Sequence, residues 1–340
     1  MSTLLVLSLV QALLVTAAAT VLAIRYAQRR QLLDQPGQRR SHRVPTPRGG
    51  GIAIVLAVFV CAAPLLKLPW IPALLLVLTL LLVAAIGWWD DHASLSAWAR
   101  IAVHVPAAVL LAAAALGTAP ALPDLSLAIA LGGVIALSTV WSINLHNFMD
   151  GINGLLTIQA AFVFTLVWLL GRFGLESALG DVPAVLAAAC VGFLPFNFPR
   201  ARIFLGDVGS GALGLLVAAV FWWAALREPY WIAVGLLLAS AFVVDASVTL
   251  LQRFWRGRRW YSAHREHLYQ WLVRRGGSHA RVVSYYMAWN LLVAAPLALL
   301  VATSRQVAVA VTAVVLAYAA GILLWCQARR AVLAGVRRHA

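Results

Sequence analysis

Charged residues are scarce in this chain of 340 residues, and only 11 of them are acidic. Charged residues make up 11% of the sequence. A soluble domain usually keeps about a quarter of its residues charged, because polar groups must cover its surface. The composition therefore excludes an ordinary soluble domain. Cysteine is also rare, at three residues, and no Cys pair or Cys/His cluster has metal-ligand spacing, which argues against disulfides and a zinc site.

Apolar residues are abundant instead, at 63% with a mean hydropathy of +0.90. They form repeated runs close to the ~20 residues that cross a bilayer core. This pattern predicts an all-α, polytopic integral membrane protein with about 11 transmembrane helices. The predicted runs cover roughly residues 3–24, 51–66, 70–89, 100–117, 125–143, 154–171, 184–198, 211–226, 230–251, 284–303 and 307–327.

Basic residues set the expected orientation. The 26 Lys and Arg give a net charge of +15, which in a soluble protein would suggest nucleic acid but in a membrane protein follows the positive-inside rule. With the N-terminus outside, the loops on that side hold only Lys67, Arg172, Arg227 and Arg305. We therefore expect an outside N-terminus, a cytoplasmic C-terminus and no nucleic-acid partner. The first 24 residues have no basic n-region, which predicts an uncleaved first helix.

The polar sequence is concentrated in the predicted cytoplasmic loops. No separate soluble domain or internal repeat is visible, so residues 1–340 are interpreted as a single membrane domain. Its functional loops are expected at about 25–50, 90–100, 144–154, 199–211 and 252–283.

Four acids lie at the cytoplasmic ends of apolar runs: Asp90, Asp91, Asp150 and Asp207. Carboxylates buried there cost about 2.5 to 3.5 kcal/mol each on insertion scales, so they need a basic side chain, a proton or a metal ion. Asp90 and Asp91 follow two Trp, and the simple alternative is a helix end with interfacial anchors. Adjacent carboxylates repel each other unless a cation lies between them.

Two polar stretches contain the last two of these acids. Residues 144–154 hold three Asn, a His and an Asp, whose amides suit a uracil-like edge, although a turn is the alternative. Residues 204–211 place Asp207 among glycines before an apolar helix. The free N–H groups of a helix N-terminus suit phosphate and a carboxylate suits Mg²⁺, while an Asp N-cap is the alternative.

Two basic loops complete the set. A Pro-Thr-Pro segment at 45–47 is followed by Arg48 and three glycines, a pattern that favours a phosphate-facing turn. His264 and His267 would share one face if their segment were helical. A solvated loop is the alternative for each.

Together, and in this order, these motifs resemble the polyprenyl-phosphate N-acetylhexosamine-1-phosphate transferases, glycosyltransferase family 4. The likeness runs over nearly the whole chain, from the Pro-Thr-Pro loop to the His264 segment. It implies transfer of a sugar 1-phosphate from a UDP-activated N-acetylhexosamine to undecaprenyl phosphate, releasing UMP. It also implies Mg²⁺, or alternatively Mn²⁺, as the cofactor, and a multi-pass protein of the bacterial inner membrane whose active site faces the cytoplasm.

The resemblance also implies residue roles. It implies that the metal ligands are Asn147 and Asp207. The catalytic candidates are Asp90, Asp91, Asp150, His264 and His267. The substrate-binding candidates are Asn153, as the uracil contact, and Arg43, Arg48 and Arg265, as cations for phosphate.

This chain departs from the family pattern at two places, the first of which removes or moves the role of one acid, while the second bears on the substrate. Ser94 stands where many members have a third Asp, and the segment from His264 to Gln270 is similar to the branch that starts O-antigen or related surface glycans. This favours that branch over the alternative, a phospho-N-acetylmuramoyl-pentapeptide transferase. Two other classes are a flippase of lipid-linked anionic precursors, which predicts midplane charges and a two-half repeat, and a non-catalytic scaffold. The sequence leaves the sugar open, GlcNAc or a modified N-acetylhexosamine, and is compatible with a homodimer.

Overall fold

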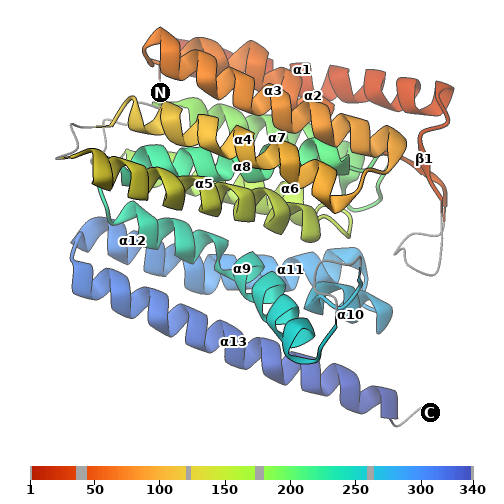
Figure 1. Cartoon of the computed structure of the whole chain (residues 1–340). Coiled ribbons are helices and arrows are strands. Elements are labelled where there is room, and N and C mark those ends of the chain that lie inside the picture. The colour runs from red at the N-terminus through yellow and green to blue at the C-terminus, as the bar shows by residue number, and fades with distance from the viewer. Residues whose placement is uncertain (1, 36–43, 120–123, 173–179, 259–263, 338–340) are drawn as a thin grey trace. The chain divides into compact units, whose positions relative to one another are not determined.

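The computed structural model describes residues 2–35, 44–119, 124–172, 180–258 and 264–337, and helices dominate it (Figure 1). The helices up to residue 225 are α1 (Thr3–Arg29), α2 (Ile52–Ala57), α3 (Trp70–Ala93), α4 (Ala97–Leu116), α5 (Leu125–Phe148), α6 (Leu155–Gly171), α7 (Val182–Asn197) and α8 (Gly206–Ala225). A π-helical turn, η1 (Val58–Ala62), and a 3-10 turn, η2 (Ala63–Leu65), extend α2. The remaining helices are α9 (Trp231–Trp255), α10 (Leu268–Arg274), α11 (His279–Trp289), π-helical η3 (Asn290–Ala294), α12 (Ala295–Ser304) and α13 (Val307–Arg337).

Eight helices in the described part of the chain are long and apolar enough to cross a membrane, and three shorter apolar helices accompany them. Each of the eleven apolar runs predicted from the sequence overlaps one of these helices. Large apolar side chains point outward, among them Leu14, Leu137 and Leu292, which are all more than half exposed. Soluble monomers rarely show such broad apolar surfaces. The prediction of an all-α, multi-pass membrane protein is confirmed at this level.

The helices extend further than the apolar runs do. Helix α5 continues to Phe148, α3 continues to Ala93, and α8 begins at Gly206, whereas the apolar runs stop at the polar residues. A helix ends where its backbone is capped, not where its side chains become polar, and so the polar residues lie on rigid helix ends. One short ladder, β1 (Leu33–Asp34) with β2 (Thr46–Pro47), adds a small strand pair to the all-α prediction.

The chain forms two compact units, which are described separately. Unit 1 comprises Met1–Gln35 and Pro45–Trp231, and unit 2 comprises Pro36–Val44 and Ile232–Ala340. The interpretation of residues 1–340 as one membrane domain stays a prediction.

Helix α8 forms the centre of unit 1. It packs against α3 and α5, and most of its apolar stretch is buried. Glycines allow these close approaches: a Cβ on Gly214 would lie 2.8 Å from the Cα of Ile143 in α5, and one on Gly209 would lie 2.7 Å from the Cα of Gly51. Small residues at helix interfaces let backbones approach in membrane proteins. This packing brings the N-terminus of α8 beside the C-termini of α3 and α5.

The loop before α2 lies against the loop before α8. Phe204 donates its N–H to the carbonyl of Pro47 at 2.8 Å, and Gly50 donates its N–H to the carbonyl of Phe204 at 2.9 Å. The N–H of Gly51 reaches the carbonyl of Leu205 at 2.7 Å. These three bonds fix the glycine-rich turn that follows Arg48 next to the start of α8.

We expect Gly51→Ala to destabilise unit 1 strongly. A Cβ at Gly51 would lie 2.1 Å from the Cα of Gly209, so the two backbones would have to separate. Overpacking of this kind costs about 1–3 kcal/mol or more. The measurement is the thermal unfolding midpoint of the purified protein in detergent. Gly133→Ala is the matched control, because no atom lies within 4 Å of its added methyl group, and equal midpoints for the two variants would contradict the packing argument.

Unit 2 is organised around one buried carboxylate, that of Asp245 on α9. It accepts hydrogen bonds from the N–H of Leu268 at 2.7 Å and of Tyr269 at 3.3 Å, at the start of α10. The hydroxyl of Tyr286 on α11 donates at 2.6 Å and the indole N–H of Trp325 on α13 at 3.0 Å. One carboxylate therefore joins four helices of the unit.

Candidate active site

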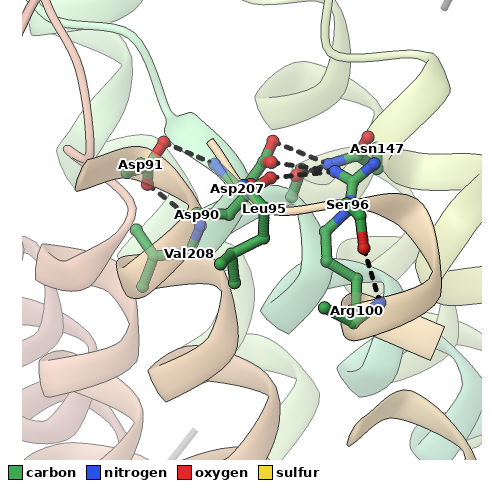
Figure 2. Close-up of polar contacts among 10 residues, drawn as sticks. Asp90, Asp91, Leu95, Ser96, Arg100, Asn147, Asp207 and Val208 are labelled. Atoms are coloured by element: carbon green, nitrogen blue, oxygen red, sulfur yellow. Dashed lines mark hydrogen bonds and ion pairs between the residues drawn. The ribbon is translucent and has the colours of Figure 1, made fainter. Parts of the chain in front are cut away.

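Three of the predicted site residues meet at the helix ends of unit 1 (Figure 2). Asp207 lies in the first turn of α8, and its Oδ1 accepts a hydrogen bond from Nδ2 of Asn147, in the last turn of α5, at 2.8 Å. The same Nδ2 lies 3.1 Å from Oγ of Ser210. Asp90, in the last turn of α3, is linked to Asp207 through Arg100. Two carboxylates and an amide thus share one small volume.

Asp91 has a different environment from its neighbour Asp90. Its carboxylate is buried and accepts the backbone N–H of Asp207 at 3.0 Å and of Val208 at 3.2 Å. These N–H groups belong to the first turn of α8, where no intrahelical acceptor exists. Asp91 therefore caps α8 from another helix, and Asp207 itself does not serve as an N-cap. A catalytic role for Asp91 stays a prediction, and the contacts make it a positioning residue.

We expect Asp91→Asn to lower both the stability and the activity. The amide keeps one acceptor but turns its NH₂ group toward a backbone N–H, which leaves one buried donor unpaired at a cost of about 1–3 kcal/mol. Asp181→Asn is the control, because the donors to its side chain, Trp168 and Arg172, both reach the same oxygen, which the amide keeps. Thermal unfolding of both variants is the measurement. A midpoint for Asp91→Asn at or above that of Asp181→Asn would contradict the capping role.

Arg100 completes the site from the first turn of α4. Its Nη1 donates to Oδ2 of Asp90 at 3.0 Å and to Oδ2 of Asp207 at 3.0 Å. Arg100 lies in the predicted functional loop at about 90–100, but it is not among the site residues predicted from the sequence. The available signal was its isolation: it is the one basic residue between Lys67 and Arg172. A lone cation beside two acids in a nearly uncharged region is a candidate partner for them.

The donor set fits a magnesium ion. Carboxylate and amide oxygens are the hard ligands that Mg²⁺ prefers, and the ion commonly takes one or two carboxylates and completes its shell with water and substrate phosphate. Asp90 and Asp207 supply carboxylates, and Asn147 would supply its oxygen after rotation of the amide. Within the described residues, no group of three or more His, Cys, Asp or Glu that could hold a metal ion is found.

Asp150 lies just after α5 and is half-buried. Burial raises the pKa of its carboxyl well above the usual range, and the charges of Asp207 and Asp91 raise it further. Its carboxyl therefore holds a proton more readily than an exposed one. In the same loop, Asn153 donates from Nδ2 to the carbonyl of Pro199 at 3.1 Å, which joins the loop to the segment before α8.

Of the two basic candidates in the first loop, the structure describes only Arg48. Arg43 lies outside the described residues. Arg48 is half-buried, and its charge acts on the carboxylates of Asp90 and Asp91. Gly49 follows it with φ +87, a left-handed conformation that favours glycine. Arg48 is therefore a cation near the acids of unit 1.

The remaining candidates lie in unit 2, where His264 and Arg265 line a basic pocket of about 480 Å³. The pocket is lined by Arg253, Arg256, Arg258, His264, Arg265, Glu266, Trp271, Arg274 and Arg329. Glu266 pairs with Arg253 and with Arg258. It is the single acid among the lining residues, so the pocket carries an excess of positive charge. Five of the six arginines are not among the site residues predicted from the sequence, because along the chain they looked only like cytoplasmic basic residues.

The two histidines of this segment lie close together without a helix. Residues 264–266 have no regular structure and His267 is the N-cap of α10, yet the two rings lie 4.8 Å apart. Burial lowers the pKa of His264 to about 4, and it also lowers the pKa of His267. Both rings are therefore neutral at pH 7 and can donate or accept hydrogen bonds, while the arginines supply the positive charge.

Carboxylates beside an arginine at the ends of apolar helices are groups with which a membrane enzyme can handle phosphate esters. The comparisons with known proteins identify the family. Residues 73–225 match the model of glycosyl transferase family 4. The chain is 31% identical over 325 residues to a decaprenyl-phosphate N-acetylglucosaminephosphotransferase of Mycobacterium leprae (strain TN), covering 82% of this chain and 79% of the relative.

Two further relatives have related names. A probable undecaprenyl-phosphate N-acetylglucosaminyl 1-phosphate transferase of Bacillus subtilis (strain 168) is 23% identical, with 81% of this chain and 77% of the relative covered. A phospho-N-acetylmuramoyl-pentapeptide-transferase of Desulforudis audaxviator (strain MP104C) is 29% identical, with 80% and 88% covered. The chain belongs to glycosyl transferase family 4, among the polyprenyl-phosphate N-acetylhexosamine-1-phosphate transferases. It is an enzyme that transfers a sugar 1-phosphate to a polyprenyl phosphate.

Proposed function

We propose that the enzyme transfers an N-acetylhexosamine 1-phosphate from a UDP-sugar to undecaprenyl phosphate with Mg²⁺, and so starts a surface glycan. The observation that carries the proposal is the cluster of Asp90, Asn147 and Asp207 around the Arg100 guanidinium. Oxygen ligands for a divalent cation and a cation for phosphate stand together at the ends of membrane helices. Two anionic substrates need such an arrangement in order to approach each other.

In the reaction, an oxygen of the lipid phosphate attacks the sugar-bearing phosphorus of the donor, and the bond to UMP breaks. One phosphoanhydride is formed and one is lost, so the main task of the protein is to position two anions. Asp207, Asp90 and Asn147 would hold the Mg²⁺, which neutralises charge on the diphosphate. Asp91 keeps the start of α8, and with it Asp207, in place.

The other candidates have supporting roles in this proposal. Arg48 supplies charge near the acids, and Asn153 contacts the uracil with the edge of its amide. His264, Arg265 and His267 contact the donor's diphosphate or sugar, and the neutral rings favour hydrogen bonding over charge pairing. Arg43 contributes positive charge near the phosphates. Asp150, in its protonated form, contributes a proton there.

We expect Asp90→Asn to slow transfer at every pH. A phosphate monoester has its second pKa near 6, so the nucleophile is already mostly dianionic at neutral pH and little remains for a base to remove. The role proposed for Asp90 is therefore to position the cation and the substrate. A pH–rate profile of the variant is the measurement, and partial rescue by added Mg²⁺ is expected. Activity restored at high pH would assign Asp90 to proton removal instead.

The decisive assay measures UMP release from UDP-N-acetylhexosamines by the purified protein with undecaprenyl phosphate and Mg²⁺. We expect release that requires both the lipid and the metal. A panel of donors compares UDP-GlcNAc, modified N-acetylhexosamines and UDP-N-acetylmuramoyl-pentapeptide. Turnover of the last alone would assign the enzyme to the peptidoglycan branch. No release with any donor would favour a flippase or a scaffold.

The same proposal fixes an orientation. Eleven spans with an outside N-terminus and a cytoplasmic C-terminus place the ends of α3 and α5 and the start of α8 on the cytoplasmic side of a bacterial inner membrane, where nucleotide sugars are available. Cysteine labelling in intact cells tests this. A thiol introduced at Trp98 should be protected from an impermeant reagent, and a thiol at Arg305 should react.

A further inference from the structure

The four carboxylate oxygens of Asp90 and Asp207 all have donors. For Asp90, Oδ1 accepts the backbone N–H of Leu95 and Oδ2 accepts Nη1 of Arg100 at 3.0 Å. For Asp207, Oδ1 accepts Nδ2 of Asn147 at 2.8 Å and Oδ2 accepts the same Nη1 of Arg100 at 3.0 Å. A single nitrogen thus bridges the two oxygens (Figure 2).

A divalent cation that bridges these acids cannot coexist with this bridge. Mg²⁺ binds oxygen at about 2.0–2.1 Å, so an ion bridging the same two Oδ2 atoms would lie in the position that Nη1 of Arg100 now occupies. A guanidinium held on the same oxygens would also lie within a few ångströms of the ion, and like charges repel strongly where water is scarce. The side chain of Asp90 is only 8% exposed, so its environment is poor in water.

Of the donors present, Arg100 is the one that a metal would displace. The N–H of Leu95 is part of the backbone, and Asn147 can turn its amide and become a ligand itself. Arg100 has a long, flexible side chain that is 26% exposed, and it is the positive group in the bridge. Its departure frees one oxygen on each acid at once.

We propose that Arg100 is a built-in cation that occupies the bridging position between Asp90 and Asp207 whenever the metal does not, so that metal binding and Arg100 release form one exchange. The inference rests on the proposed metal site. The exchange keeps a positive charge beside the two acids both with and without the metal, and it lowers the apparent metal affinity, because only the fraction of molecules with Arg100 released can bind. Metal therefore binds best together with phosphates that attract the released guanidinium.

The test is Mn²⁺ binding by the purified protein. Electron paramagnetic resonance of the free ion measures how much Mn²⁺ remains unbound. We expect Arg100→Ala to bind Mn²⁺ about 10-fold more tightly than the wild type, because hydrogen bonds to charged groups that competed with the metal are gone. Arg202→Gln is the matched control. It removes a positive charge from an exposed position that stacks on Phe196, and its affinity should equal that of the wild type.

A competitor separates direct occupancy from a general charge effect. Millimolar methylguanidinium should weaken Mn²⁺ binding by Arg100→Ala and leave the wild type unchanged, since only the variant has room for it between the two acids. Arg100→Gln gives a second variant if the alanine form is unstable, and Mg²⁺ should raise the unfolding midpoint of either variant more than that of the wild type.

The outcomes distinguish this inference from the proposed function. Loss of Mn²⁺ binding in Asp207→Ala, with tighter binding in Arg100→Ala that methylguanidinium reverses, supports the exchange. Loss in Asp207→Ala with unchanged or weaker binding in both Arg100 variants overturns the exchange and leaves the metal site standing. Unchanged binding in Asp207→Ala overturns the metal site itself.

Discussion

Asp207→Ala is expected to abolish transfer while the protein remains folded in membranes. Asp207 stands in the first turn of α8 with its carboxylate directed at Asn147 and Arg100. Removing it takes away a proposed metal ligand and half of the charge that holds the guanidinium. Loss of one preorganised electrostatic group in a phosphoryl-transfer site costs on the order of 10²–10³ in rate, and loss of a metal ligand at least as much. UMP release under saturating Mg²⁺ is the measurement.

The fold should survive this substitution, because the hydrogen bonds that cap α8 come from Asp91 to the backbone N–H groups of Asp207 and Val208. Alanine keeps both N–H groups. Asp181→Ala is a useful control, since Asp181 is a half-exposed carboxylate that pairs with Arg172 and not with the site residues, and its loss should leave transfer unchanged. Near-normal turnover in Asp207→Ala would show that this carboxylate is not a metal ligand.

Asp245→Ala should be among the most damaging changes for the stability of unit 2. The carboxylate is 1% exposed and accepts from two backbone N–H groups, a tyrosine hydroxyl and an indole N–H. Its loss leaves those donors without their acceptor, and breaking a buried charged network costs about 3–5 kcal/mol. We expect a fall of many degrees in the unfolding midpoint and a lower yield of folded protein.

Asp245→Asn is the graded comparison for that prediction. The amide keeps one acceptor oxygen of the same shape, so its midpoint should lie between those of the alanine variant and the wild type. Transfer should fall in both, since Leu268 and Tyr269 follow His267 directly and the bonds to Asp245 hold this turn. An unfolding midpoint for the alanine variant at the wild-type value would mean that the network does not stabilise unit 2.

Local sequence information predicted a large part of the fold. Apolar runs found every helix that the structure contains except the short α10, because the transfer of apolar residues into a bilayer depends on composition over about 20 residues and needs no knowledge of partners. The run boundaries were less accurate. Asn147 and Asp90 were placed in loops, but both lie in the last turns of helices.

The candidate site was partly predictable for the same reason. Few acids exist in the chain, so Asp90 and Asp207 stood out at the ends of apolar runs. Asn147 was indicated by the family resemblance. The roles of individual side chains were less accessible. Asp90 and Asp91 are adjacent and chemically identical, yet a turn of about 100° on a helix directs one toward Arg100 and the other under the start of α8.

By itself the sequence determined a helical membrane protein, the family to which it belongs and a small set of acids at the ends of its helices, because these follow from composition and from short motifs. Tertiary structure alone decided which groups meet. Arg100 and Asp207 are 107 residues apart, and Asp91 caps a backbone N–H 116 residues away. Such contacts depend on how closely α3, α4 and α8 pack, and that spacing is set by small residues whose partners no local pattern reveals.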